Sequence, residues 1–224
     1  MKYIKLLLLV AFSTLFISCG SSSDGGNDIT EGSTHLRVAC VGDSITEGTG
    51  LNNPTKDSYP SQLSDMLGEG WEVQNFGLAY ATLLKSGNVP YWKTNKFTPS
   101  HEYNPDIVVI MLGTNDAKSY NWVDKDQYIS DYTALIDTYK NLPSKPIVFI
   151  CYPPPVYKTF SGVTDSRIRN EVIPKITQVA SLNGVEIIDI YNVLSNKKEL
   201  FPDGIHPNIE GARQLAQTVY QTIY

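Results

Sequence analysis

The feature that most restricts the fold of this chain is the segment 106–112, which is apolar throughout after its first residue. A strand with apolar side chains on both faces belongs inside a mostly parallel sheet that helices cover on both sides. Further strand-like segments occur at 38–41, 71–76, 146–151 and 185–190, and helix-like segments separate them. This alternation predicts an α/β fold built on a five-stranded sheet.

Residues 1–18 resemble the signal peptide of a bacterial lipoprotein. Lys2 and Lys5 precede an apolar run that is too short to span a bilayer, and Cys19 follows it. The resemblance implies that Cys19 becomes the lipid-bearing first residue. Residues 19–34, rich in Gly, Ser and Asp, are then expected to form a flexible tether. The alternative is an ordinary cleaved signal peptide with an incidental cysteine.

This start of the chain predicts an exported protein that a lipid anchors to a bacterial (outer) membrane. The weak likeness of the residues after the cysteine to surface-export signals leaves the periplasmic and the cell-surface side both open. The lipid anchor is the only link to a membrane that we expect.

Residues 35–224 have the length of one folded domain, and hydrophobic residues make up 42% of the full chain. The net charge is −5 and the longest basic run is Lys197-Lys198, so nucleic acid is not an expected partner. Cys40 and Cys151 lie in strand-like segments, where a thiol acts as a small buried hydrophobe. No cluster of Cys and His has metal-ligand spacing, so we expect no metal, no cofactor and, by default, a monomer.

Three predicted strands end in loops that carry residue types used in catalysis: 42–44 (Gly-Asp-Ser), 75–77 (Asn-Phe-Gly) and 113–116 (Gly-Thr-Asn-Asp). The carboxyl ends of parallel strands meet at one edge of the sheet, where open α/β folds bind their ligands. Ser44 is therefore either a nucleophile at this edge or the cap of the following helix, which is a common role for serine after a strand.

A serine nucleophile needs a base, a group that orients the base, and donors for the developing oxyanion. Of the three histidines, only His206 has a carboxylate close by in a tight loop, that of Asp203. The short spacing lets Asp203 hold one imidazole nitrogen while the other faces Ser44. The alternative is a surface Asp-Gly turn followed by Asn208 as a helix cap.

Four motifs now stand in order: Gly-Asp-Ser-Ile at 42–45, Gly77 in its strand-end loop, Gly-Thr-Asn-Asp at 113–116, and Asp-Gly-Ile-His-Pro at 203–207. Their order and spacing resemble the four signature blocks of the SGNH (GDSL-type) hydrolases across the whole of residues 35–224. The resemblance implies a three-layer α/β/α sandwich on a five-stranded parallel sheet, a flavodoxin-like arrangement.

The same resemblance implies a role for each matched residue. Ser44 is the nucleophile, His206 the general base, and Asp203 orients His206. The oxyanion donors are the backbone N–H groups of Ser44 and Gly77 and the side-chain amide of Asn115. The reaction implied is hydrolysis of an ester through an acyl-enzyme.

The region of Trp92 and the stretch 116–122 resemble esterases of this family near the sialate and xylan O-acetylesterases. We therefore expect a small acyl group, acetate first, on a carbohydrate, with Trp92 and Trp122 as candidate substrate-binding residues. The alternative for both tryptophans is that they pack the loops onto the sheet.

Two other functions stay open. The first is a lysophospholipase, arylesterase or thioesterase of the same family. The second is a non-catalytic surface lipoprotein that binds glycans, against which the complete set Ser44, Asp203, His206 and Asn115 argues.

Overall fold

The computed structural model describes residues 35–224. The predicted signal peptide at 1–18, the lipid-bearing Cys19 and the tether at 19–34 lie outside the described residues and stay predictions. In the described part of the chain, no helix is both long and apolar enough to cross a membrane.

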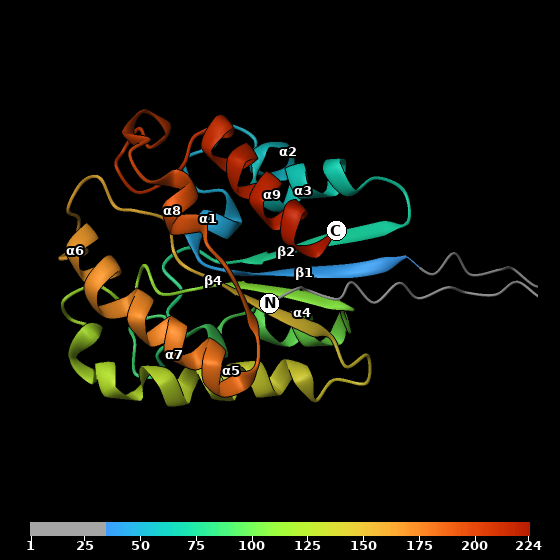
Figure 1. The fold of residues 1–224 in the computed structure, drawn as a ribbon, viewed down its shortest axis with the longest axis horizontal. Helices are drawn as coiled ribbons and strands as arrows, with labels where there is room; N and C mark the ends of the chain where they lie inside the picture. The colour runs from blue at the N-terminus through green and yellow to red at the C-terminus, as the bar shows by residue number, and fades with distance from the viewer. Residues whose placement is uncertain (1–34) are drawn as a thin grey trace, which may run out of the picture. The chain divides into compact units, whose positions relative to one another are not determined.

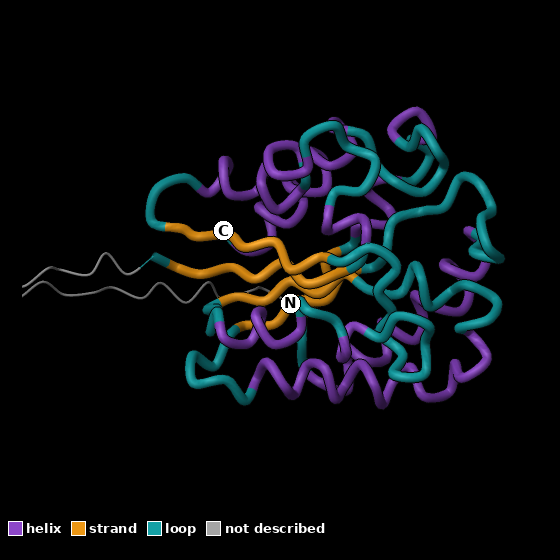
Figure 2. The backbone as a smooth tube through the Cα atoms, turned by 180° about the vertical axis from the view of Figure 1, so that it is seen from behind, coloured by secondary structure: helices purple, strands orange, loops and turns teal. Residues whose placement is uncertain are grey.

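The centre of the domain is a sheet of five parallel strands in the order β2-β1-β3-β4-β5 (Figure 1, Figure 2). The strands are β1 (Leu36–Gly42), β2 (Trp71–Gly77), β3 (Ile107–Met111), β4 (Ile147–Cys151) and β5 (Glu186–Ile188). Strand β3 is buried along its whole length because it lies in the middle of the sheet. The predicted α/β fold is confirmed, and the strand order is flavodoxin-like.

Helices form a layer on each face of the sheet (Figure 1). One layer contains α1 (Ser44–Glu47), α2 (Pro54–Asp57), α3 (Tyr59–Leu67), α8 (Ile190–Leu194) and α9 (Ile209–Ile223). The other contains α4 (Phe97–Glu102), α5 (Tyr128–Lys140) and α7 (Ile173–Asn183), with the short α6 (Asp165–Arg167) ahead of α7. Each layer buries its own hydrophobic cluster against the sheet, which makes a three-layer α/β/α sandwich.

Local signals explain where several helices end. Pro60 lies in the first turn of α3, where its missing N–H has no intrahelical partner to lose, and Gly68 caps the other end. Gly184 caps α7 with φ 59°, a left-handed conformation that glycine adopts without strain. Helix α9 carries a buried apolar stripe at spacings of three and four residues, which faces the sheet.

The segment between β2 and β3 is organised by burial instead of by long helices. Tyr91 is fully buried, and its hydroxyl donates a hydrogen bond to the carbonyl of Phe76 at 2.9 Å. Besides its α-helices, the described part of the chain contains the 3-10 helices η1 (Tyr91–Lys93), η2 (Trp122–Gln127) and η4 (Lys198–Leu200) and the π-helix η3 (Ile168–Val172).

The register of the sheet brings the catalytic loops together. Gly42, the last residue of β1, pairs with Gly77 of β2 and with Met111 of β3. A Cβ at Gly42 would overlap the side chain of Thr46, so the glycine lets α1 turn back closely over the end of its strand.

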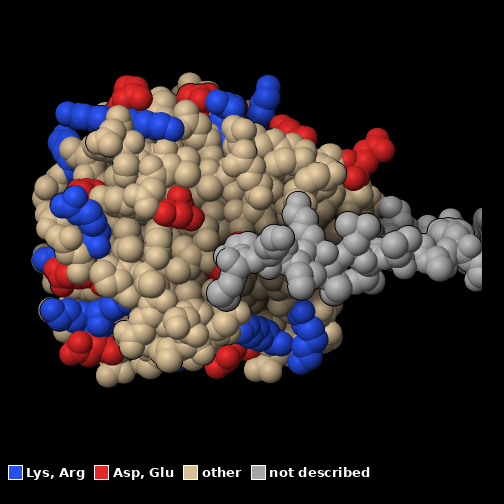
Figure 3. All heavy atoms as spheres, in the orientation of Figure 1, with Lys and Arg blue, Asp and Glu red and all other residues tan. Residues whose placement is uncertain are grey.

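Cys40 and Cys151 are buried free thiols on β1 and β4, with β3 between them. Their burial fits the predicted role of small hydrophobes. On the face that Figure 3 shows, basic and acidic side chains lie interspersed near the rim, and most of the surface between them is uncharged.

Candidate active site

Ser44, His206 and Asp203 form a continuous row of hydrogen bonds, although 162 residues separate Ser44 from His206. Nε2 of His206 lies 3.0 Å from Oγ of Ser44, and Nδ1 lies 2.6 Å from Oδ2 of Asp203. An ionised carboxylate can only accept, so Nδ1 donates to Asp203 and Nε2 of the neutral ring accepts from the Ser44 hydroxyl. In this geometry the imidazole can take a proton from the hydroxyl.

The loop before α9 holds the ring of His206 in place. Oδ1 of Asp203 accepts the backbone N–H groups of Ile205 at 2.8 Å and of His206 at 2.7 Å. Gly204 has φ 87°, and a side chain there would collide with the backbone of Lys158. Burial raises the pKa of Asp203, but the hydrogen bonds from His206 and the two backbone N–H groups outweigh burial and lower the pKa. Asp203 is therefore ionised at neutral pH.

Ser44 is the first residue of α1, and Asp43, not Ser44, caps that helix. Oδ1 of Asp43 accepts the N–H of Ile45 at 3.0 Å, which leaves the Ser44 hydroxyl to meet His206. Asp43 is fully buried, and its burial raises its pKa to about 7, against the opposing effect of the Ile45 N–H. At neutral pH, about half of the Asp43 carboxyl groups next to Ser44 in the chain are therefore protonated.

Asn115, in the loop after β3, is buried and lines the same cavity as Ser44. Its Nδ2 donates to the carbonyl of Ala81 at 3.2 Å, and Oδ2 of Asp43 lies 3.5 Å away, at the limit of a hydrogen bond. One amide hydrogen is therefore weakly held. The backbone N–H of Ser44 has no acceptor among the described residues. Both groups are available to an incoming oxyanion.

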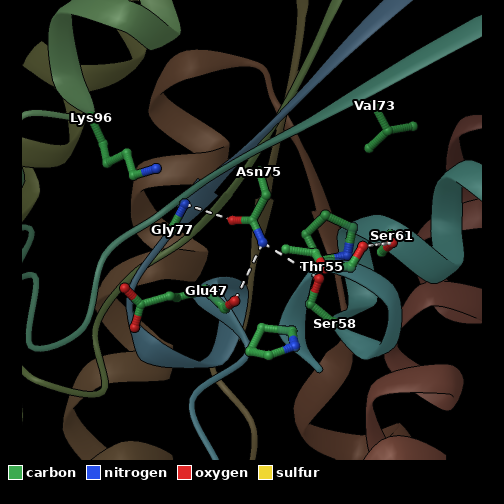
Figure 4. A pocket seen from close by; sticks show the side chains of 10 residues that line it. Glu47, Thr55, Ser58, Ser61, Val73, Asn75, Gly77 and Lys96 are labelled. Carbon is green, nitrogen blue, oxygen red and sulfur yellow. Dashed lines mark hydrogen bonds between the residues drawn. The ribbon is translucent and has the colours of Figure 1, made fainter. Parts of the chain in front are cut away.

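Gly77 does not fit the role of oxyanion donor that the family resemblance implied. Its N–H already donates to Oδ1 of Asn75 at 2.9 Å (Figure 4). Gly77 lines a separate cavity of about 450 Å³ together with Glu47, not the cavity of Ser44. A Cβ at Gly77 would meet the backbone of Thr46 and Glu47, so this glycine permits the close packing of β2 against α1.

Tyr80 and its neighbour Ala79, in the loop after β2, line the cavity of Ser44. Tyr80 is the one with an unusual backbone. Its φ is 67°, a left-handed conformation that strains a residue with a side chain. The described residues offer no acceptor to its backbone N–H. Sequence reasoning missed Tyr80, because a tyrosine gives no sign of positive φ and a glycine nearby was the more obvious choice.

Trp92 and Trp122, the candidate substrate-binding residues, do not line the cavity of Ser44. Trp122 is buried, and its indole N–H donates to Glu171 at 2.7 Å. The indole N–H of Trp92 donates to the carbonyl of Leu83 at 2.9 Å. Both tryptophans pack loops onto the domain, which was the alternative role.

The cavity at Ser44 has a volume of about 120 Å³. Its walls are Ser44, Thr49, Ala79, Tyr80, Asn115, Lys118, Phe160, Val163, Ile205 and His206. Both apolar and polar groups line this small space. Within residues 35–224, no group of three or more His, Cys, Asp or Glu side chains is placed to hold a metal ion.

A flavodoxin-like sandwich with a hydrogen-bonded serine, histidine and aspartate at the carboxyl edge of its sheet has the layout of an acyl hydrolase. The model of the GDSL-like lipase/acylhydrolase family matches residues 40–214, and the chain belongs to this family. The predicted membership of the SGNH (GDSL-type) hydrolases is thereby confirmed, and the described domain is an ester-hydrolase domain.

Named relatives add detail. The chain is 34% identical over 206 residues to an acetylxylan esterase of Xylanibacter ruminicola, over 84% of this chain and 43% of that protein. The chain thus spans less than half the length of this curated relative. A carbohydrate acetylesterase from Sinorhizobium meliloti, Est24, shares the fold with a TM-score of 0.69 at 22% identity, covering 84% of this chain and 98% of its own. The M. smegmatis aryl esterase does so with a TM-score of 0.68 at 22% identity, over 84% and 98%.

Proposed function

We propose that the protein is a serine esterase that removes acetyl groups from carbohydrates, with Ser44 as nucleophile, His206 as general base and Asp203 as the residue that orients His206. The observation that carries the proposal is the unbroken row of hydrogen bonds from Asp203 through His206 to Ser44, at 2.6 and 3.0 Å. Such a row activates a hydroxyl that is otherwise a weak nucleophile.

In the first half of the reaction, Oγ of Ser44 attacks the ester carbonyl while Nε2 of His206 takes its proton. The carbonyl oxygen becomes an oxyanion, which the side-chain amide of Asn115 and the backbone N–H groups of Ser44 and Tyr80 stabilise. The tetrahedral intermediate then collapses. The C–O bond to the alcohol breaks, and His206 returns its proton to the leaving oxygen.

In the second half, a water molecule attacks the acyl-enzyme at the same carbonyl, and His206 now takes the proton of that water. The second tetrahedral intermediate expels Oγ of Ser44, which recovers its proton from His206. The acid leaves the site, and Asp203 holds the imidazole orientation throughout.

The size of the acyl group and the nature of the alcohol come from separate observations. A cavity of about 120 Å³ at Ser44 favours acetyl over a long fatty chain, which speaks against the lysophospholipase alternative. The 34% identity to an acetylxylan esterase favours a carbohydrate as the alcohol. An arylesterase is the second candidate, since an aryl esterase shares the fold.

The test is hydrolysis of p-nitrophenyl acetate, butyrate and octanoate by the purified full chain in detergent, with Ser44→Ala as control. We expect activity on acetate that falls steeply with chain length and drops by orders of magnitude in Ser44→Ala. Circular dichroism and the Tm of the variant verify that it folds. Equal activity of the wild type and a folded Ser44→Ala would contradict the role of Ser44 as nucleophile. Activity that rises with chain length would favour the lysophospholipase.

We further propose that Cys19 carries the lipid that attaches the protein to a membrane. Incorporation of labelled palmitate into the full chain in bacterial cells tests this proposal. We expect label in the wild type and none in Cys19→Ala. Label in neither protein would favour the ordinary cleaved signal peptide.

A further inference from the structure

Two aromatic side chains at the cavity of Ser44 are exposed to solvent. The side chains of Tyr80 and Phe160 are 59% and 57% exposed, and both line that cavity. They come from loops 80 residues apart in the sequence, one after β2 and one after β4. Large apolar groups left in water beside a reaction site are candidates for contact with substrate.

Phe160 has an exposed side chain, but its backbone belongs to a tightly hydrogen-bonded turn. Ser161 and Gly162 have φ 47° and 80°, and Phe160 and Val163 pair across them in an antiparallel bridge, so the four residues make a tight hairpin turn. Nη1 of Arg167 donates to the carbonyl of Gly162 at 3.0 Å and to that of Ala117 at 2.7 Å. This guanidinium ties the turn to the loop after β3, and Phe160 is presented on a rigid support.

Tyr80 is held in a comparable way. Its backbone has φ 67°, and Nζ of Lys118 lies 4.9 Å from the centre of its ring. An ammonium against an aromatic face is attractive and fixes the ring orientation. Both rings are thus pre-organised, which lowers the entropy cost of binding a flat partner.

Lys118 supplies a polar group to the same cavity. The residue is only 4% exposed and lines the cavity, yet the described residues place no acceptor within hydrogen-bonding distance of Nζ. Burial lowers its pKa, and the carboxylates of Asp43 and Asp116 oppose that shift. Nζ is not among the fully buried polar atoms that lack a partner, so it reaches the cavity, where it can donate hydrogen bonds to the oxygen atoms of a ligand.

We propose that Tyr80, Phe160 and Lys118 form a binding site for the pyranose ring that carries the ester. The inference rests on the proposed function and names the part of the site that recognises the alcohol. A sugar ring presents flat C–H faces to aromatic side chains and hydroxyl oxygens to an ammonium donor. An aryl alcohol would satisfy Tyr80 and Phe160, but it would leave Lys118 without an acceptor.

The experiment compares kcat/KM for two acetate esters. Ethyl acetate has no ring, and mono-O-acetylated xylobiose has two pyranose rings. The quantity compared is kcat/KM for the sugar ester divided by kcat/KM for ethyl acetate. We expect this ratio to fall about tenfold in Phe160→Ala, with a larger change in KM than in kcat. Tyr120→Ala is the matched control, because Tyr120 is 53% exposed in a neighbouring loop but does not line the cavity. Its ratio should equal that of the wild type.

Lys118→Met separates a sugar from an aryl alcohol when phenyl acetate is added as a third ester. We expect the variant to lose kcat/KM for the sugar ester relative to ethyl acetate and to keep the ratio for phenyl acetate. The Tm of each variant is measured to verify folding. If the wild type hydrolyses no ester, the proposed function fails. Two results would overturn the pyranose site in an active wild type. In the first, neither variant changes the ratio for the sugar ester; in the second, both variants change the ratio for phenyl acetate as much as the ratio for the sugar ester.

Discussion

The carboxylate of Asp203 has its two oxygens divided between His206 and the backbone: Oδ2 faces Nδ1 of the ring at 2.6 Å, and Oδ1 accepts the N–H groups of Ile205 and His206. In Asp203→Asn the single carbonyl oxygen is required by the two backbone N–H groups, so the amide NH₂ would face Nδ1. The ring would then carry its proton on Nε2 and could not accept the proton of Ser44.

We therefore expect Asp203→Asn to lower kcat by roughly 10³–10⁴-fold with little change in Tm. Steady-state kinetics on p-nitrophenyl acetate measure the effect. Asp137→Asn, at an exposed position of α5, is the control and should behave as wild type. An Asp203→Asn enzyme within tenfold of wild type would remove the orienting role of this carboxylate.

Asn115 gives a second test of the site. Its side chain lines the cavity of Ser44, and one hydrogen of its amide is held only by the 3.5 Å contact to Asp43. Asn115→Ala is expected to lower kcat by about 10²–10³-fold and to change KM much less, because the oxyanion exists only near the transition state. A change confined to KM would mean that Asn115 binds the ground state instead.

Gly77→Ala tests whether Gly77, at the end of β2, serves the close packing of β2 against α1. A Cβ there would lie 2.7 Å from the backbone carbon of Thr46, and backbone cannot move aside cheaply. We expect the free energy of unfolding, from urea titration, to fall by about 1–3 kcal/mol. At Gly70 a Cβ meets nothing within 4 Å, so Gly70→Ala is the control and shows only the cost of its positive φ. An unchanged stability in Gly77→Ala would mean that α1 does not pack against β2 as closely as described.

Asp43 makes stability depend on pH. Burial raises its pKa from the ordinary 3.8 to about 7 in the folded state, so between these values the folded protein binds more protons than the unfolded chain. Its contribution to stability is therefore fully present below pH 4 and is lost as pH rises toward 7. The free energy of unfolding of the wild type, relative to Asp43→Asn, should fall over this window by on the order of a few kcal/mol.

Urea titrations of both proteins at several pH values measure this difference. The asparagine keeps an oxygen for the N–H of Ile45, and any fixed cost of its NH₂ beside Asn115 does not change with pH. A difference between the two proteins that stays constant from pH 4 to pH 8 would contradict the raised pKa.

The sequence predicted the sheet well because fully buried parallel strands have an unmistakable pattern, of which 106–112 is the clearest case. Ser44, Asp203 and His206 could be named as candidates because their chemistry depends on residue type and on loops that parallel strands place together, and the structure places them within hydrogen-bonding distance of one another. Gly77 could not be judged in this way. Whether a backbone N–H points into a cavity depends on chain direction after the strand, and Tyr80 turns at a φ that its side chain disfavours.

The aromatic residues show the same limit. From the sequence alone, Trp92 and Trp122 fit a substrate-binding role and a packing role equally well. Only their indole hydrogen bonds to Leu83 and Glu171 distinguish the two roles. Phe160 had a weak signal, the Ser-Gly pair after it, which marks a tight turn. Nothing in the sequence indicated that this turn reaches Ser44.

The direction of β1 has a consequence for access. The strand starts at Leu36 and ends at Gly42, two residues before Ser44, so the chain enters the described domain at the edge of the sheet opposite the active site. A group joined to the domain through Leu36 is therefore attached at the end of β1 away from Ser44, and its attachment leaves the catalytic loops unchanged.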